Sequence, residues 1–209
     1  MQGSPPGPGR TLFVGDVHGC SEELSALIEL ARADRVFLCG DLFTKGPDPL
    51  GVWALIRQHD LACVKGNHDD HVATKPTKFG HWLTPEIQSF LSRLPLTRRV
   101  GRCILVHAGI HPIKGLAGTT RRIALYQRRF PDDKDPANPF WYDAGWQGPE
   151  CVVFGHDAMR GLVRREKGGV PIAIGLDTGC VYGGKLSGWL MEEDRVLQVP
   201  ARRVYKPVG

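Results

Sequence analysis

Five short clusters along the chain each carry a side chain of a type that binds metal ions in proteins. They are Gly15-Asp16-Val17-His18-Gly19, Gly40-Asp41-Leu42-Phe43-Thr44-Lys45-Gly46, Gly66-Asn67-His68-Asp69, Val106-His107-Ala108-Gly109 and Phe154-Gly155-His156-Asp157. In chain order they supply Asp, His, Asp, Asn, His and His, which are the ligands of a dinuclear metal centre. Two divalent ions about 3.5–4 Å apart can clamp a phosphoryl group and generate hydroxide from water at neutral pH.

The ligand types restrict the metal and suggest a bridge. Carboxylate, imidazole and amide groups suit Mn, Fe, Co, Ni or Zn, and the clusters hold no Cys that would indicate a thiolate zinc site. Asp41 is the natural bridging ligand, because each of its two oxygens can face one ion. Asn67 offers a neutral oxygen, which limits the negative charge where an anionic substrate must bind.

Apolar runs in front of these clusters predict the strands that position them. Residues 11–14, 36–39, 103–106 and 152–154 are apolar runs, each followed by a Gly- or His-containing cluster, which is typical of a buried strand that opens into a loop. In an open α/β sheet, the loops at the carboxyl ends of the strands bind ligands. We therefore expect the six ligand residues to meet at one sheet edge.

The remaining elements follow from caps, turns and periodicity. We expect helices from Ser21 to about Arg32, from Pro49 to about Gln58 and from Pro85 to about Arg93, the last with Thr84 as its N-cap. Further strands are predicted over residues 61–65, 100–106, 171–176, 186–191 and 195–199, the last two as a hairpin that turns at residues 193–194.

Taken together and in this order, the motifs resemble those of the calcineurin-like metallophosphoesterase superfamily, in particular its phosphoprotein-phosphatase-like branch. Within that branch the sequence is most similar to the bacterial symmetrical bis(5′-nucleosyl)-tetraphosphatases, which hydrolyse diadenosine tetraphosphate. Residues 40–50 followed by 66–69, and residues 175–186, carry this finer likeness, and the similarity extends from about Thr11 to Leu197.

The resemblance implies a fold and a set of metal ligands. The fold class is α/β, with two mixed sheets packed face to face and flanked by helices in a four-layer α/β/β/α sandwich. Asp16 and His18 would bind the first metal and Asp41 would bridge. The second metal would be held by three residues, Asn67, His107 and His156, and manganese is the expected ion.

The resemblance also assigns the catalytic and substrate-binding residues. His68 would be the general acid, because the unperturbed pKa of a His lies near neutrality. Eukaryotic Ser/Thr phosphatases have Asp and Arg where this chain has Thr44 and Lys45, so His68 must be oriented by Asp69 or by a water. Lys45 can still hold phosphate as a point charge. Arg128 or Arg129, at the end of a predicted helix, resembles the phosphate-binding Arg of relatives.

Composition and charge agree with a soluble enzyme that acts on anions. The chain has 209 residues, a formal net charge of +5 and a pI of about 9.0, and five pairs of adjacent arginines would attract a polyanion. We expect a flexible tail over residues 1–9 and a single domain over 10–209. No stretch is apolar enough to cross a membrane, no specific nucleic-acid binding is expected, and six isolated cysteines indicate reduced thiols and a cytoplasmic location.

Several other polar and aromatic residues have a structural and a functional interpretation. Asp157 and Asp177 could orient metal-bound His residues or cap a turn. The rings of Trp82, Trp141, Tyr142, Trp146 and Tyr182 could include a base-stacking surface, although packing explains most of them. Four His residues outside the motifs are interpreted as structural: His59, His71, His81 and His111.

The sequence therefore predicts a metal-dependent phosphohydrolase in which a bridging hydroxide attacks phosphorus. The favoured substrate is a dinucleoside polyphosphate, cleaved symmetrically to two ADP. A protein Ser/Thr/Tyr phosphatase and an endopolyphosphatase are alternatives on the same centre. A non-catalytic scaffold is the alternative from another class, and the complete set of ligands argues against it.

Overall fold

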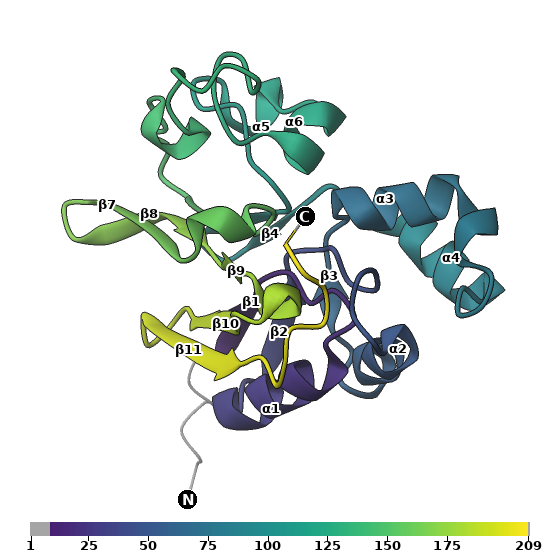
Figure 1. The fold of residues 1–209 in the computed structure, drawn as a ribbon. Coiled ribbons are helices and arrows are strands. Elements are labelled where there is room, and N and C mark those ends of the chain that lie inside the picture. Colours follow the sequence, from purple (N-terminus) through teal and green to yellow (C-terminus); the bar gives the residue numbers. More distant parts are fainter. Residues whose placement is uncertain (1–8, 209) are drawn as a thin grey trace, which may run out of the picture.

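Two mixed β-sheets stack face to face in this protein, and helices cover their outer faces (Figure 1). The computed structural model describes residues 9–208, so the tail expected over residues 1–9 lies outside the described part except for Gly9. The predicted α/β/β/α sandwich is confirmed. No helix in the described part of the chain is long and apolar enough to cross a bilayer.

The first sheet has the strand order β11-β10-β1-β2-β3, with β9 paired to β10. Its strands are β1 (Thr11–Val14), β2 (Arg35–Leu38), β3 (Ala62–Cys63), β9 (Asp177–Thr178), β10 (Lys185–Leu190) and β11 (Arg195–Pro200). Strands β1, β2 and β3 are parallel, whereas β10 runs antiparallel to both β1 and β11. The parallel strands bring the first three metal motifs to the same sheet edge.

The second sheet has the strand order β4-β5-β6-β8-β7. Its strands are β4 (Thr97–Val100), β5 (Cys103–Val106), β6 (Cys151–Phe154), β7 (Val163–Lys167) and β8 (Val170–Gly175). Strands β5, β6 and β8 are parallel, and the outer strands β4 and β7 are antiparallel to their neighbours. The two remaining metal motifs follow β5 and β6.

Side-chain alternation along the central strands builds the layers. Phe13 of β1 packs between the sheets with Leu105 of β5 and Trp189 of β10. Its neighbours Leu12 and Val14 pack on the opposite face, in a core that includes residues of α1 (Ser21–Ala31) and α2 (Pro49–Gln58). The period of two in a strand is what allows one short strand to contribute to two cores.

The outer face of the second sheet is covered by short elements: α5 (Gly115–Gly118), α6 (Arg121–Tyr126) and a 3₁₀ turn, Trp141–Asp143. Helices α3 (Asn67–Thr74) and α4 (Pro85–Arg93) lie together beside the sandwich, joined by a 3₁₀ turn, Pro76–Phe79 (Figure 1). Two more 3₁₀ turns, Ala158–Arg160 and Cys180–Tyr182, follow metal-site segments.

The three predicted helix starts are confirmed, and so is Thr84 as the N-cap of α4. Asp48 caps α2 by accepting a hydrogen bond from the Gly51 N–H, and Pro49 follows at the first helical position. Thr84 caps α4 in the same way through the Ile87 N–H. Each cap fixes the point at which its loop ends, and the loop before α2 carries Thr44 and Lys45.

One prediction about strands was wrong, and one strand was not predicted. Residues 100–106 are not one strand, because the chain reverses at Gly101, whose φ of +56° lies in the left-handed region, and β4 pairs with β5 as a hairpin. Strand β7 was missed. It reaches β8 through Gly168-Gly169, both with positive φ, and two such residues are a strong hairpin signal in a sequence.

Candidate active site

The loops that follow strands of both sheets meet at one site. Asp16 and His18 follow β1, Asp41 follows β2, and Asn67 and His68 begin α3 just after β3. His107 follows β5 and His156 follows β6. The first sheet thus supplies four of the six predicted ligands and the second sheet supplies two.

The first group of predicted ligands is compact and buried. One potential ligand atom from each of Asp16, His18 and Asp41 lies within 4.8 Å of the others. The His18 Nε2 atom is 3.5 Å from Asp41 Oδ2 and 3.9 Å from Asp16 Oδ2. All three side chains are at most 4% exposed, so their polar atoms face one another rather than water.

The second group of predicted ligands converges even more closely. His107 Nε2 lies 2.8 Å from Asn67 Oδ1 and 3.1 Å from His156 Nδ1, and the latter two atoms are 3.1 Å apart. The other ring nitrogen of His107, Nδ1, is 2.9 Å from the Cys39 carbonyl oxygen, which can only accept a hydrogen bond. In the neutral ring Nε2 therefore carries a lone pair, and it points at a carbonyl oxygen and a second imidazole.

Asp41 joins the two groups. Its Oδ2 faces His18, while its Oδ1 lies 3.6 Å from His107 Nε2. The same Oδ1 accepts a hydrogen bond from the backbone N–H of His68, in the first turn of α3, where the helix dipole favours a negative charge. Each oxygen of the carboxylate therefore faces one ligand group, which is the arrangement that a ligand bridging two ions needs.

The backbone at the site is held in unusual conformations. Of the seven non-glycine residues with positive φ among residues 9–208, four belong to the site: His18, Asp41, Lys45 and His156, with φ between 47° and 74°. Such conformations cluster at functional sites, where surrounding structure imposes them.

Glycine in the motifs is explained by close approach of the carboxylates. A Cβ atom on Gly66 would lie 2.1 Å from Asp41 Oδ1, and one on Gly155 would lie 1.9 Å from Asp16 Oδ1. Any larger residue at either position would push a predicted ligand out of place.

Asp69 holds the bridging residue from behind. Its Oδ2 accepts hydrogen bonds from the backbone N–H groups of Asp41 and Gly66, at 2.8 and 2.9 Å, and its Oδ1 accepts one from Leu42. Both oxygens are thus engaged by backbone N–H groups, and no hydrogen bond joins Asp69 to the His68 ring in the described part of the chain. The sequence did contain a sign of this role, because Asp69 is the third residue of α3, where an acidic side chain typically accepts a hydrogen bond from the backbone just before the helix.

Burial disfavours the charged form of three carboxylates at the site, those of Asp16, Asp41 and Asp177. Desolvation raises the pKa of Asp41 to about 7 and that of Asp177 to about 6. It also raises the pKa of Asp16 well above its usual value, and the nearby carboxylates of Asp177 and Asp41 raise it further. The charge of Lys45 lowers all three pKa values, but the effect of burial outweighs it.

Burial also keeps the imidazoles neutral. It lowers the pKa of His107 to about 4 and the pKa values of His18 and His156 well below their usual value. Neutral imidazoles and carboxylates in need of a counter-charge are the donor set of divalent ions. Among the described residues, the buried Nε2 of His156 has no hydrogen-bond partner, while the Nδ1 of the same ring and the Nε2 of His107 both face Asn67 Oδ1, where a cation would satisfy them. The residues therefore fit two metal ions.

Lys45 and His68 lie on the open side of the predicted ligands. The Lys45 ammonium group is 3.0 Å from His18 Nε2 and 5.4 Å from the centre of the Tyr182 ring. The His68 side chain is one-third exposed, with its Nε2 4.0 Å from Asp41 Oδ2. Desolvation, followed by the charge of Lys45, lowers the pKa of His68 to about 3. The free ring is therefore neutral at pH 7, and its protonated form is a stronger acid than an ordinary imidazolium.

A cavity of about 220 Å³, which we call the metal cavity, opens over these groups. It is lined by the polar side chains that a bound phosphate would contact. Its lining includes His68, Lys45, Arg128 and Asp177. Asp177 was expected to orient a His or cap a turn. It caps a turn by accepting a hydrogen bond from the Gly179 N–H, and it also reaches the cavity.

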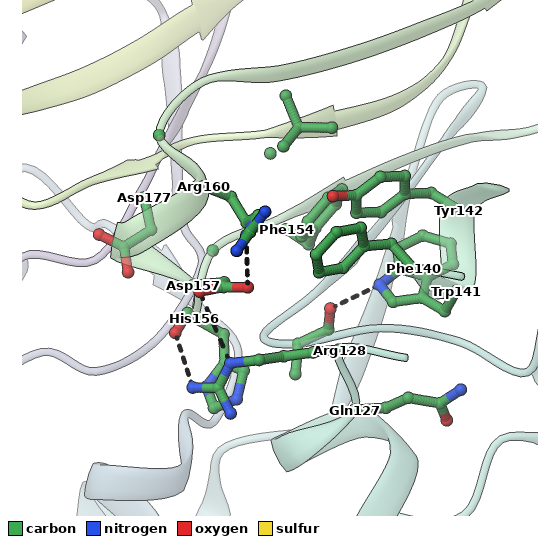
Figure 2. A pocket seen from close by; sticks show the side chains of 15 residues that line it. Gln127, Arg128, Phe140, Trp141, Tyr142, Phe154, His156, Asp157, Arg160 and Asp177 are labelled. Carbon is green, nitrogen blue, oxygen red and sulfur yellow. Dashed lines mark hydrogen bonds and ion pairs between the residues drawn. The ribbon is translucent and has the colours of Figure 1, made fainter. Parts of the chain in front are cut away.

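The side chains of the two candidate arginines, Arg128 and Arg129, lie in different places. Helix α6 ends at Tyr126, earlier than predicted, and Arg128 and Arg129 follow it with their backbone N–H groups bound to Asp133. Arg128 extends to the metal cavity, where its Nε is 3.6 Å from Asp157 (Figure 2). Arg129 instead bonds the Asn138 carbonyl and stacks on Phe140, with its Cζ 4.4 Å from the ring centre.

Beyond Arg128, the site is closed by packed aromatic rings (Figure 2). Phe140 stacks on Tyr142 at 5.4 Å, and Arg160 covers Phe140 while it pairs with Asp157. The cavity among them holds only about 10 Å³, which is the space of one water. Trp141, Tyr142 and Trp146 are at most 7% exposed, so these three candidate stacking residues are part of the core.

Comparison with known proteins agrees with this geometry. The family model described as calcineurin-like phosphoesterase matches residues 9–184. A symmetrical bis(5′-nucleosyl)-tetraphosphatase of Methylobacillus flagellatus is 26% identical over 267 aligned residues, which cover 91% of this chain and 95% of the relative. One from Edwardsiella ictaluri is 28% identical over 274 residues, which cover 92% and 96%.

Solved structures share the fold. A crystal structure described as a presumed diadenosine tetraphosphatase has a TM-score of 0.83 and 32% identity, and the match covers 95% of this chain and 96% of that one. A metallophosphoesterase from Sphaerobacter thermophilus, at 19% identity and a TM-score of 0.60, has the same fold. The alignments with the two curated relatives are longer than this chain, so those relatives contain several dozen residues that have no counterpart here.

Proposed function

Because the chain belongs to the calcineurin-like phosphoesterase family, and is thus a phosphohydrolase, we propose that it hydrolyses dinucleoside polyphosphates such as diadenosine tetraphosphate to two nucleoside diphosphates. The observation that carries this proposal is the pair of ligand groups joined by Asp41, with Lys45 and Arg128 on the same cavity. The names of the curated relatives support the choice of substrate.

The proposed metal ligands are Asp16, His18 and Asp41 for one ion and Asp41, Asn67, His107 and His156 for the other. When bound, two divalent ions supply a nucleophile from water and stabilise charge at phosphorus. Manganese is the proposed ion, since the carboxylate and amide oxygens among the ligands suit it.

The residues of the chain itself bind the substrate and handle the proton. Lys45 and Arg128 are the cationic side chains on the cavity, and we assign them to the phosphate chain of the substrate. His68 is assigned to the leaving oxygen. It reaches the cavity with one-third of its side chain exposed, and a bound polyphosphate would raise its pKa because opposite charge favours the imidazolium form.

Attack at the centre of the phosphate chain is the part of this proposal that defines the products. Two ADP are released only if two phosphates lie on each side of the cleaved bond, whereas asymmetric attack gives ATP and AMP. The proposal therefore requires that the cavity binds the two inner phosphates.

Turnover of four substrates tests the function. Diadenosine tetraphosphate, long-chain polyphosphate, a phosphoserine peptide and p-nitrophenyl phosphate are each compared with Mn²⁺, Co²⁺ and Mg²⁺, and the nucleotide products are separated by chromatography. We expect the highest kcat/KM for diadenosine tetraphosphate, with ADP as its only nucleotide product. Faster turnover of the phosphopeptide or of polyphosphate would replace the proposal by one of the two alternatives.

A further inference from the structure

An open groove lies beside the metal cavity and has no role in the chemistry described above. It is lined by the loop residues 43–50 and by Lys78, Phe79, His81 and Trp82, and we call it the aromatic groove. We propose that the aromatic groove binds the nucleoside at one end of the substrate by stacking. This inference rests on the proposed function, because it assigns a place to the nucleoside of a nucleoside polyphosphate.

The aromatic groove is large enough and is connected to the reaction site. Its volume is about 520 Å³, within the roughly 300–1,000 Å³ typical of small-molecule sites. Lys45 lines both the aromatic groove and the metal cavity, so the two spaces meet at this residue. A phosphate held at Lys45 would therefore have its nucleoside directed either into this groove or toward solvent.

Aromatic rings line the aromatic groove at different depths. Phe43 and Trp82 are buried, with ring centres 5.8 Å apart, and they fix the floor. Phe79 lies 5.8 Å from Trp82 and is half-buried, and His81 is exposed next to them. A half-buried ring on a fixed floor is a suitable stacking surface, because its conformational freedom is already lost before the ligand arrives.

The charge of the aromatic groove favours an anionic ligand. Its lining has two ammonium groups, Lys45 and Lys78, and one carboxylate, Asp48. That carboxylate is already engaged, because it accepts hydrogen bonds from the Ser21 hydroxyl at 2.6 Å and from the Gly51 N–H at 2.8 Å. The excess positive charge is therefore available to the phosphates next to the nucleoside.

The aromatic pocket beyond Arg128 does not offer such a space. The pocket beyond Arg128 holds only about 10 Å³, since Arg160 and Asp157 pair over the rings of Phe140 and Tyr142. A nucleobase fits the aromatic groove and does not fit that pocket in this conformation. The structure thus assigns one nucleoside to the aromatic groove and leaves the other outside.

The aromatic groove has few groups that could distinguish one base from another. The Thr44 hydroxyl lies 3.3 Å from His18 Nδ1, and Asp48 is engaged as described. Stacking without directed hydrogen bonds accepts any base, because every base has a π-face. We therefore expect similar binding of adenosine and guanosine diphosphates.

Competitive inhibition of p-nitrophenyl phosphate turnover tests the aromatic groove without a dinucleotide substrate. Ki values are measured for ADP, GDP and pyrophosphate on the metal-loaded enzyme and on the Phe79→Leu variant, which keeps an apolar side chain but removes the ring. We expect ADP and GDP to bind more tightly than pyrophosphate to the wild type. Phe79→Leu should weaken both nucleotides by roughly tenfold relative to pyrophosphate.

Phe90→Leu is the matched control. Phe90 is also a partly buried aromatic residue that packs on the same core, but its ring lies against Trp53, 5.0 Å away, and outside the aromatic groove. It should change none of the three Ki ratios. Equal Ki values for ADP and pyrophosphate in the wild type, or equal effects of the two Leu variants, would overturn the assignment. If ADP binds through Phe79 while diadenosine tetraphosphate is not hydrolysed, the groove assignment holds and the proposed function fails.

Discussion

The carboxylate of Asp69 holds Asp41 in place by accepting a hydrogen bond from its backbone N–H at 2.8 Å. Asp69 is fully buried and accepts two more bonds, from Leu42 and Gly66. The residue that joins the two predicted metal sites therefore depends on an acidic residue from the next motif along the chain.

Asp69→Ala should destabilise the protein and impair metal binding together. Three buried N–H groups would lose their acceptor, and each such loss costs about 1–3 kcal/mol. We expect a lower free energy of unfolding in urea and less bound metal by elemental analysis. Glu86→Gln is the control, since the Glu86 carboxylate forms an exposed ion pair with Arg57, and such pairs contribute about 0–1 kcal/mol. Equal effects of the two variants would refute a supporting role of Asp69.

Asp41→Asn should remove at least one of two bound ions and most of the activity. The amide is neutral and offers one oxygen, whereas the carboxylate faces both ligand groups. The loss of turnover should exceed the roughly 10–100-fold typical when an outer partner of a metal site is lost. Mass spectrometry of the native protein counts the ions, and a variant that keeps two ions and full activity would exclude the dinuclear assignment.

Metal binding should weaken as the pH falls below about 7. Burial raises the pKa of Asp41 to about 7, so at pH 6 the metal-free carboxyl group holds a proton that an ion must displace. His107, with its pKa lowered to about 4, is already neutral at pH 6 and releases none. Calorimetric titration with Mn²⁺ in two buffers of different ionisation enthalpy should show more proton release at pH 6 than at pH 8. Equal release at both pH values would contradict the expectation.

His68→Ala should lower the turnover of diadenosine tetraphosphate far more than that of p-nitrophenyl phosphate, whose leaving group needs no proton. General acid catalysis contributes roughly 10²–10⁴-fold. Steady-state kinetics of the two substrates at pH 7 measures the difference. An equal loss for both substrates would mean that His68 acts in binding instead.

Arg128→Ala should raise KM for diadenosine tetraphosphate by roughly tenfold or more, because a charged hydrogen bond to phosphate is lost. Arg129→Ala is the matched control, as its side chain lies on Phe140 and off the metal cavity. Higher ionic strength should reduce the difference between wild type and Arg128→Ala, since exposed charges are screened beyond about 10 Å at 0.1 M salt. A larger effect from Arg129 would reverse the assignment.

The sequence predicts the strands of the layers and the loops on which the predicted ligands lie, because both depend on local signals. Apolar runs such as residues 103–106 have to be buried, and the Gly-Asp and Gly-His steps after β2 and β6 mark where the strands open into loops. The two-sheet closure came from the family resemblance, since nothing in a run of four apolar residues says which sheet it joins.

What the sequence could not predict depends on a shift of one residue or on distant contacts. The choice between Arg128 and Arg129 depends on α6 ending at Tyr126, because neighbouring side chains in an extended segment point to opposite sides. The aromatic groove joins Phe43 to Phe79, 36 positions apart in the printed sequence, and no local pattern relates them. Asp69 looked like a candidate partner for His68, and only the structure shows that both its oxygens are engaged.

The predicted ligands are divided between the two sheets, so a bound metal centre would link the two halves of the molecule, each made of one sheet and its loops. His107 and His156 belong to one half, and Asp16, His18, Asp41 and Asn67 belong to the other. Pulling the halves apart would break coordination at the second proposed ion, which His107 and His156 would hold together with Asp41 and Asn67, so a loaded centre would resist sliding of one sheet over the other in addition to performing chemistry. Chelation should therefore accelerate amide exchange at the interface between the sheets, around Phe13 and Leu105, as well as abolish turnover.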